Sequence, residues 1–412
     1  MRIALIMDHF DPTRGGAENV AVWLATALAQ RGHEVHVICH DVAPRINRYR
    51  AATQRASHDA HRSRLAHGND AALPEGLHVH RLRGFKLSHA IGFRFFGQRA
   101  AMRCRRLAPD VIHSFTLARP GDIYQPIHGI YAALQAQAIA SRGTASSASF
   151  KELMLHLSAK KRLLLMLEKK AFTRSSGPAR VLTMGTLMGR DLKHFYAMPA
   201  TRIVQMPTPL LAVPPRRHAE QRTWFRGNYK LNDDAPVALF VGHDFRRKGL
   251  RHAMDAVRHS RTAWQLVVVG LGKVREYIEL AERWGISERV RFIGPTAAID
   301  DVFPAADALL LPTFYDPCPF ATLEALTHRL PVVTSMQNGL ADIILSHEAG
   351  IVVPTALDVP ALSEALDSLA TASARQKRAH NTAAALRACT VAADEYVDKM
   401  LGLYEAVIKK RS

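Results

Sequence analysis

Cysteine is scarce in this sequence, and long apolar runs are missing. Cys39, Cys104, Cys318 and Cys389 lie far apart and form no CxxC pair, which argues against a zinc ribbon and offers no disulfide framework. No window holds the roughly 18 consecutive apolar residues of a spanning helix. The opening segment, MRIALIMDHFD, is too short and too acidic for a secretory signal. We therefore expect a cytoplasmic protein that does not cross a membrane.

Acidic residues are also in short supply. The chain has 55 Lys and Arg against 36 Asp and Glu, which gives a formal net charge of +19. Only Asp59, Asp70 and Glu75 oppose the basic residues between Arg45 and Arg106. Such an excess indicates an acidic partner, and composition alone leaves nucleic acid, anionic lipid and a phosphorylated substrate open. Because aromatic residues make up 7% and are not interleaved with the basic ones, we expect no nucleic-acid partner.

A second basic segment, KELMLHLSAKKRLLLMLEKKAF, runs from Lys151 to Phe172 and carries a helical apolar stripe. This pattern is typical of a helix that lies on an anionic membrane surface. An ordinary amphipathic helix with a solvated basic face explains it equally well.

Strand and helix patterns alternate along the chain. RIALIM is a short apolar run, a glycine-bearing loop follows, AENVAVWLATALAQRG has helical spacing, and EVHVIC alternates like a strand. Prolines crowd residues 206–220, after which the alternation starts again. We expect an α/β protein with two tandem Rossmann-like domains. The predicted ranges are 1–205 for the first domain, 206–234 for a linker, 235–388 for the second domain, and 389–412 for a helix that packs back towards the first.

Two glycine-bearing or basic loops follow predicted strands. Gly15 and Gly16 come after the first strand, where a glycine permits close backbone approach and a helix N-terminus attracts anions. A simple tight turn is the alternative. Arg247 and Lys248, in VGHDFRRKGL, are able to neutralise a diphosphate, Arg as a planar fork and Lys as a point charge. Taken alone, such a loop is more often solvated surface.

The stretch YDPCPFATLEAL, from Tyr315 to Leu326, places two carboxylates eight residues apart. Asp316 follows an apolar run, and Glu324 lies in the first turns of a predicted helix that begins near Ala321. The two acids are suited to binding sugar and ribose hydroxyls. They also fit the acid and base of a hydrolase, or a helix with favourable acids near its start.

The order of these motifs resembles a known family. GGAE, the basic loop with KG, the D-x7-E pair, PVVTS and the turn QNGLADII together resemble retaining glycosyltransferases of family 4 with the GT-B fold. VGHDFRRKG and YDPCPFATLEALTHRLPVVTS look most like the branch that contains the lipopolysaccharide core glucosyltransferase I. The resemblance covers nearly the whole chain.

The resemblance implies a nucleotide-sugar donor in the C-terminal domain and an acceptor in the N-terminal one. It places the diphosphate on Arg247 and Lys248, the ribose on Glu324 and the transferred sugar on Asp316. Backbone amides of Phe320, Ala321, Thr322 and Leu323 would meet the sugar and phosphates, Gly15 and Gly16 would close on the phosphate, and His128 would lie near the reacting sugar. His128, Asp316 and Lys248 are therefore the predicted catalytic residues.

Two departures from the family pattern stand out. Many members carry Glu at the position of Asp316 and Arg at the position of His243. Asp233-Asp234 and Asp300-Asp301 are adjacent acids and lack the DxD spacing of metal-dependent transferases, so we expect neither a metal nor a cofactor.

The hypothesis is a metal-independent, retaining hexosyltransferase. It would move glucose from a UDP-sugar to an anionic glycolipid or lipopolysaccharide core acceptor, as a peripheral protein on the inner face of the cytoplasmic membrane. The alternatives are another lipid or polysaccharide acceptor, a hydrolase or epimerase on the same fold, and a non-catalytic subunit that binds nucleotide sugars.

Overall fold

The computed structural model describes residues 1–43, 73–84, 89–142, 149, 152, 158–173, 177–211, 219–296 and 299–411. The chain divides into two compact units, and the last part of the chain returns to the first unit. The first unit consists of Met1–Ile139, Thr144–Ala212 and Val391–Ser412, and the second of Ala140–Gly143 and Val213–Thr390. The predicted basic stretch from Arg45 to Arg64, together with Lys86, lies outside the described residues.

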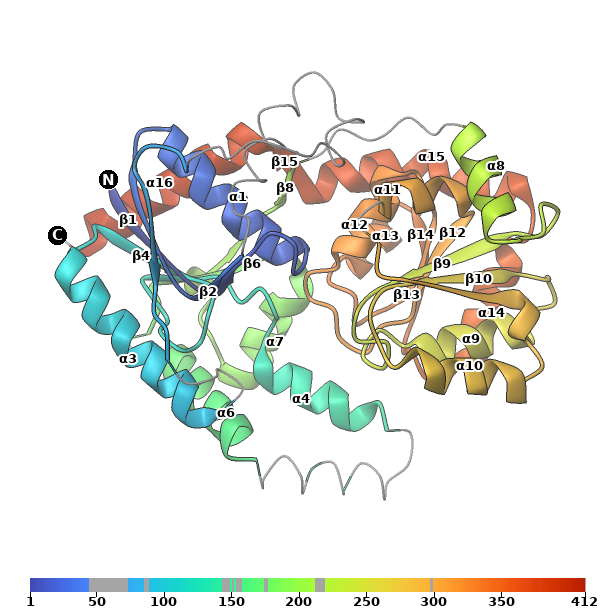
Figure 1. Cartoon of the computed structure of the whole chain (residues 1–412), viewed down its shortest axis with the longest axis horizontal. Helices are drawn as coiled ribbons and strands as arrows, with labels where there is room; N and C mark the ends of the chain where they lie inside the picture. The colour runs from blue at the N-terminus through green and yellow to red at the C-terminus, as the bar shows by residue number, and fades with distance from the viewer. Residues whose placement is uncertain are drawn as a thin grey trace. The chain divides into compact units, whose positions relative to one another are not determined.

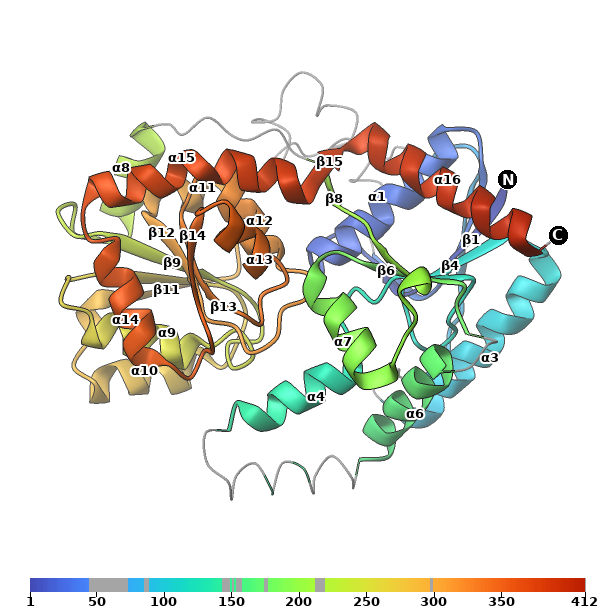
Figure 2. The same cartoon turned by 180° about the vertical axis from the view of Figure 1, so that it is seen from behind.

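A seven-stranded sheet forms the centre of the first unit, with α1 and α16 on one face and α3 and α6 on the other (Figures 1 and 2). Its strand order is β3-β2-β1-β4-β5-β6-β7, and all neighbouring strands are parallel. The strands are β1 (Arg2–Phe10), β2 (Glu34–Val42), β3 (Leu77–Arg81), β4 (Val111–Ser114), β5 (Ile123–Tyr124), β6 (Arg180–Thr183) and β7 (Ile203–Gln205). The helices are α1 (Gly16–Gln30), α3 (Ala90–Leu107), α4 (Tyr131–Ala140), α6 (Ala159–Thr173), α7 (Thr186–Tyr196) and α16 (Ala393–Arg411).

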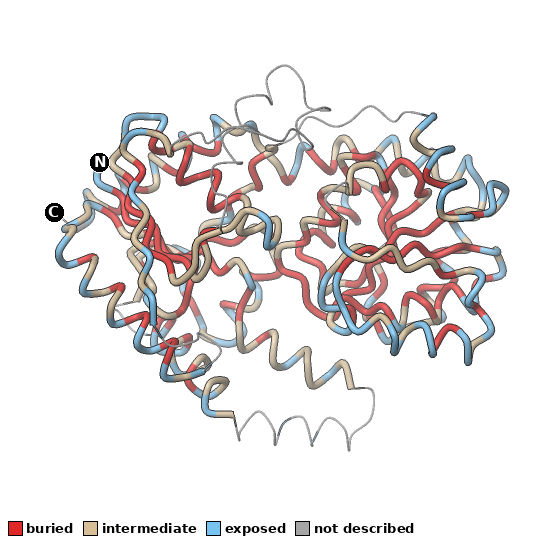
Figure 3. The backbone as a smooth tube through the Cα atoms, in the orientation of Figure 1, coloured by how far each residue is buried: buried red, intermediate tan, exposed pale blue. Residues whose placement is uncertain are grey.

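The middle of strand β1, residues 3–7, is wholly apolar because helices cover both of its faces. Ile3 and Leu5 belong to the core that includes α1 and α16, whereas Ala4 and Ile6 pack with residues of α3. Successive side chains of a strand point to opposite faces, so a strand covered by helices on both sides must be apolar throughout. Figure 3 shows the resulting buried strands in each unit.

The last helix, α16, completes the core of the first unit. The rings of Tyr396 and Trp23 lie 5.9 Å apart between their centroids, and the hydroxyl of Tyr404 lies 2.8 Å from Nδ1 of His113. Burial lowers the pKa of His113 to about 3, so this imidazole is neutral. The segment predicted as one helix over 389–412 contains the end of α15 (Ala372–Cys389), β15 (Thr390–Ala392) and α16. Strands β15 and β8 (Thr208–Leu210) form a separate two-stranded sheet.

The second unit is built on a six-stranded parallel sheet of order β11-β10-β9-β12-β13-β14. Helices α9, α10 and α14 cover one face, and α12, α13 and α15 the other (Figures 1 and 2). The strands are β9 (Val237–Val241), β10 (Gln265–Val269), β11 (Val290–Gly294), β12 (Ala308–Leu311), β13 (Val332–Ser335) and β14 (Gly350–Val353). The helices are α8 (Ala219–Asn228), α9 (Leu250–His259), α10 (Val274–Arg283), α11 (Ile299–Val302), α12 (Phe320–Thr327), α13 (Ala341–Ser346), α14 (Val359–Ser368) and α15. The predicted α/β fold with two Rossmann-like domains is confirmed.

The range 206–234, predicted as a linker, holds two regular elements, β8 and α8. Helix α8 is tied to the second unit by Arg226, which is 2% exposed and donates to Asp307 at 2.7 Å. Arg222 donates to the same carboxylate at 2.9 Å. Because this anchor joins residues about eighty positions apart, the local proline pattern carried no sign of it.

Three histidines stack on β2 and β3, outside every predicted site. The ring centroid of His36 lies 5.0 Å from that of His78 and 5.2 Å from that of His80. His36 Nε2 lies 3.1 Å from Glu34, and His80 Nδ1 lies 2.8 Å from Arg103. Burial lowers the pKa of His80 to about 4, helped by the positive charge of Arg103. Burial also lowers the pKa of His36.

We expect this histidine cluster to make the folding stability of the first unit sensitive to acid. In the folded protein both pKa values lie below the usual histidine value of 6.5, so the unfolded chain takes up protons that the folded cluster does not. Stability that is present above pH 6.5 is therefore lost as the pH falls towards about 4. Replacing His80 by Gln should reduce this slope in urea unfolding measured across the pH range, whereas the exposed His89→Gln should not. An unchanged slope in His80→Gln would contradict the assignment.

Candidate functional site

The strand order of the second unit brings two loops to one edge of its sheet. β9 lies between β10 and β12, so the connections that leave β9 and β12 diverge. In open parallel sheets, ligands bind at the carboxyl ends of the strands where the order reverses in this way. The loop after β9 spans 242–249 and the loop after β12 spans 312–319. Both predicted charged segments therefore lie at this point.

The basic loop after β9 is held by backbone hydrogen bonds and by one glycine. The N–H of Lys248 donates to the carbonyl of Asp244 at 2.9 Å, and the carbonyl of Arg247 accepts from the N–H of Phe314 at 2.8 Å. Gly249 caps α9 with a φ of 81°. A Cβ at this position would lie 1.9 Å from the carbonyl oxygen of Pro312, so only glycine fits.

Arg247, Lys248 and Asp316 come together at this edge. Nζ of Lys248 forms an ion pair with Oδ2 of Asp316, and the two residues are 8% and 4% exposed. Nη1 of Arg247 donates to the carbonyl of Tyr315 at 2.7 Å and lies 3.9 Å from Oδ1 of Asp316. The site thus concentrates positive charge around one buried carboxylate. Such charge is suited to a diphosphate.

Helix α12 begins at Phe320, after Pro319, without a side-chain cap. The N–H groups of Phe320, Thr322 and Leu323 donate to carbonyls of the preceding turn at 2.9, 2.9 and 3.0 Å. Three of the four amides predicted to meet the sugar and phosphates, the exception being Ala321, thus already donate to carbonyls within the fold. Glu324 lies half-buried in the same helix.

A buried asparagine, which the sequence did not single out, holds the Asp316 loop. Asn338 is 1% exposed, and its amide donates to the hydroxyls of Thr322 at 2.8 Å and Thr334 at 3.0 Å. The backbone beside it pairs with that of Asp316, since the N–H of Gly339 donates to the carbonyl of Asp316 at 2.8 Å. In the sequence, Asn338 appeared only within the turn QNGLADII. Its partner Thr322 and the paired residue Asp316 lie outside that turn. Asn338 therefore joins α12, β13 and the acidic loop.

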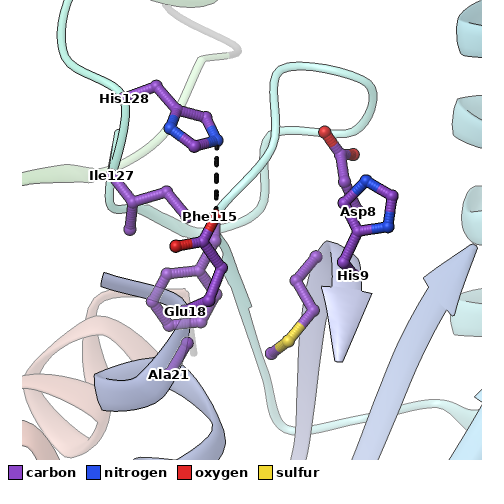
Figure 4. Close-up of a pocket in the computed structure, with 8 residues that line it drawn as sticks. Asp8, His9, Glu18, Ala21, Phe115, Ile127 and His128 are labelled. Atoms are coloured by element: carbon purple, nitrogen blue, oxygen red, sulfur yellow. Dashed lines mark ion pairs between the residues drawn. The ribbon is translucent and has the colours of Figure 1, made fainter. Parts of the chain in front are cut away.

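The remaining predicted residues lie in the first unit, as does a pocket that the sequence did not indicate. Gly15 precedes α1 with an extended φ of 173°, and α1 starts at Gly16 without a side-chain cap. His128, whose side chain is 73% exposed, lies 3.9 Å from the carboxylate of Glu18. Figure 4 shows this pair across a pocket that Asp8 and His9 also line. The GGAE motif thus contributes the carboxylate of Glu18 to the pocket, whereas its two glycines are not among the lining residues.

Within the ranges given above, no group of three or more His, Cys, Asp or Glu side chains is placed to hold a metal ion. Among the described helices, none is long and apolar enough to cross a membrane.

Comparison with known proteins identifies the family. Residues 14–210 match the model "Glycosyltransferase Family 4", and residues 221–386 match the model "Glycosyl transferases group 1". The chain belongs to glycosyltransferase family 4. The lipopolysaccharide glucosyltransferase WaaG of Escherichia coli K12 is 31% identical over 37% of this chain and 43% of its own length.

Solved structures agree in fold. A crystal structure of WaaG, a glycosyltransferase involved in lipopolysaccharide biosynthesis, matches with a TM-score of 0.74 and 20% identity, over 98% of this chain and 99% of WaaG. HepE of Anabaena, in complex with UDP and glucose, matches with a TM-score of 0.67 and 14% identity, over 98% of this chain and 99% of HepE. At these identities the likeness establishes the GT-B fold.

The sequence alignments span only part of the curated relatives. The chain covers 43%, 35% and 50% of the length of the first three. His243, a predicted departure from the family pattern, accepts a hydrogen bond at Nδ1 from the N–H of Leu271 at 3.2 Å. Arg247 and Lys248 thus remain the basic side chains beside Asp316.

Proposed function

We propose that this protein transfers glucose from UDP-glucose to a hydroxyl of an anionic glycolipid of the lipopolysaccharide core type, with retention at the anomeric carbon. The observation that carries the proposal is the pair of basic side chains, Arg247 and Lys248, beside the buried Asp316 at the switch point of a family 4 chain. The similarity to WaaG supports the sugar and the acceptor class. The neighbour that binds UDP and glucose supports the donor.

The second unit would hold the donor. Arg247 and Lys248 would bind the diphosphate, Asp316 the transferred sugar and Glu324 the ribose, with the start of α12 near the sugar. A fixed cluster of positive charge stabilises the negative charge that grows on the departing diphosphate. These side chains supply that charge without a metal ion.

The first unit would hold the acceptor, with Gly15 and Gly16 near the phosphate and His128 near the reacting sugar. The acceptor hydroxyl would attack the anomeric carbon from the face that the diphosphate leaves. The departing diphosphate oxygen would take the hydroxyl proton. One carbon–oxygen bond forms as another breaks, and because both bonds lie on the same face of the sugar ring, the product keeps the donor's anomeric configuration.

The test is donor binding followed by transfer. In a thermal-shift panel of UDP-, GDP- and ADP-glucose, we expect UDP-glucose to raise the melting temperature most, because a ligand of the native state stabilises it by mass action. Labelled glucose should then appear on a lipopolysaccharide core acceptor. Release of free glucose without acceptor would indicate a hydrolase, and binding without turnover a non-catalytic subunit.

We also propose that the first unit docks on the inner face of the cytoplasmic membrane. α3 contains no acidic residue and exposes Ile91, Phe95 and Met102 by 72%, 39% and 50%. α6 lies beside it, with Nζ of Lys160 6.0 Å from the centroid of a ring on α3. Met166 of α6 is 54% exposed. Exposed apolar side chains among basic ones fit an anionic lipid surface.

Vesicle sedimentation tests this surface. Each basic residue near an anionic membrane contributes about 1 kcal/mol, so we expect the double variant Arg105→Gln/Arg106→Gln to bind phosphatidylglycerol vesicles roughly thirtyfold more weakly. The control variant, Lys273→Gln/Arg275→Gln, removes two exposed charges from the second unit and should bind normally. Binding of the unaltered chain that does not depend on anionic lipid would refute the proposal.

A further inference from the structure

The pocket of the first unit has an unusual chemical lining for so basic a protein. It lies at the carboxyl end of β1, beside the loops that follow β4 and β5 (Figure 4). Two carboxylates, Asp8 and Glu18, line it together with the apolar side chains of Phe115 and Ile127. The pocket therefore presents hydrogen-bond acceptors over an apolar wall.

Asp8 has an unsatisfied oxygen. Its Oδ1 is buried and receives no hydrogen bond from any part of the chain that the structure describes. A buried acceptor without a donor costs free energy, so a carboxylate kept in this state is suited to a ligand that brings the donor. Sugar hydroxyls are such donors.

The side chains that line the pocket disfavour an anion, because they include two carboxylates and no Lys or Arg, and Arg14 lies outside the lining. His9, next to Asp8, lies 3.7 Å from Asp41, and burial together with the charge of Arg14 lowers its pKa below 6.5. His9 is thus neutral at pH 7 and does not cancel the two carboxylates. The carboxylate of Glu18 lies 3.9 Å from Nε2 of the exposed His128. A phosphate group placed here would face carboxylates, which repel it.

We propose that this pocket binds an uncharged, hydroxyl-bearing sugar ring of the acceptor through Asp8 and Glu18, and that it rejects a ring that carries phosphate. The proposal rests on the proposed function only in identifying the ligand as the acceptor. An anionic acceptor would then carry its phosphates on neighbouring residues and present a neutral ring at the reacting position. Asp8 acts as a specificity-determining residue.

The experiment compares neutral and phosphorylated sugars on the full chain without donor. The probes are the methyl glycosides of glucose, galactose and mannose against the corresponding sugar 6-phosphates, with Kd values from NMR titration up to about 100 mM. We expect at least one neutral glycoside to bind at least about tenfold more tightly than its phosphate. Equal or tighter binding of the phosphates, or no binding of any neutral glycoside, would overturn the proposal.

Asp8→Asn supplies the second arm, because it keeps the shape and removes the charge. We expect its Kd for the neutral glycoside to rise about tenfold and its preference over the phosphate to shrink. Its melting temperature should not fall, since no hydrogen bond to Oδ1 is lost. The control Asp394→Asn removes a 90% exposed carboxylate of the same unit and should leave both Kd values unchanged.

Binding of the donor is measured separately from binding of the sugars. UDP-glucose should raise the melting temperature of Asp8→Asn as much as that of the unaltered chain. A normal donor response with unchanged sugar affinities in Asp8→Asn refutes the role of Asp8 and leaves the proposed function standing. Absence of any donor response, with the sugar preferences as expected, refutes the proposed function and leaves the pocket assignment standing.

Discussion

Replacing Lys248 by Met should lower kcat by about 10²–10³-fold, the usual loss when one preorganised charge at a developing anion is removed. The variant should also be less stable. Lys248 and Asp316 form a buried pair, and removing one partner of such a pair costs about 3–5 kcal/mol because a buried charge is left without compensation. Transfer is measured well below the melting temperature of the variant, so that folded protein is compared with folded protein. Lys273→Met, at an 82% exposed side chain of the same unit, is the matched control and should keep both stability and activity.

A double variant separates catalysis from folding. Lys248→Met combined with Asp316→Asn removes both charges, so we expect most of the lost stability to return. If Lys248 binds the diphosphate, the affinity for UDP stays low in the double variant. Asp316→Asn alone should bind UDP at least as tightly as the unaltered chain, because the ammonium group no longer shares its charge with a carboxylate. Recovery of UDP affinity in the double variant would show that Lys248 has only a structural role.

Gly249→Ala should destabilise the second unit by several kcal/mol and abolish transfer. A left-handed φ costs an L-residue about 1–2 kcal/mol. In addition, the new Cβ would lie 1.9 Å from the carbonyl oxygen of Pro312, which no side-chain rotation relieves. Either the basic loop or the loop after β12 must shift, and these two loops carry Lys248 and Asp316.

Gly285→Ala is the matched control for this prediction. Gly285 has a φ of 67° and no atom within 4 Å of an added Cβ, so the change costs only the backbone term of about 1–2 kcal/mol. Trp224, Trp264 and Trp284, three of the four tryptophans, belong to the second unit, so urea unfolding followed by fluorescence reports mainly on that unit. Equal losses in the two variants would show that the contact with Pro312 is unimportant.

The features that were predicted from the sequence are those that depend on residues close together in the chain. The run RIALIM and its counterparts in the second half are apolar because helices cover both faces of each sheet, and the loops after them carry the glycines and charges that parallel strands place at one edge. For the same reason the basic loop before α9 and the acidic loop before α12 were predicted from local pattern.

What the sequence did not reveal depends on partners far apart in the chain. The pairing of Lys248 with Asp316, the link from Asn338 to Thr322, and the Asp8 pocket each join segments that only the folded sheet brings together. Asp8 itself was predicted to begin the glycine-bearing loop after RIALIM, whereas in the structure it belongs to β1, which extends to Phe10. Helix α8 was missed because its anchor, Asp307, lies about eighty residues beyond it.

The packing of α16 on the first unit has a consequence for synthesis of the chain. Domains generally fold as units while the ribosome elongates the polypeptide from its N-terminus. Here the apolar surface of α1 around Trp23, together with His113, packs against Tyr396 and Tyr404, which are translated after the second unit. We therefore expect the first unit to complete its core only after the second unit has been translated, and a nascent chain that stalls before residue 393 to leave that surface open to chaperones.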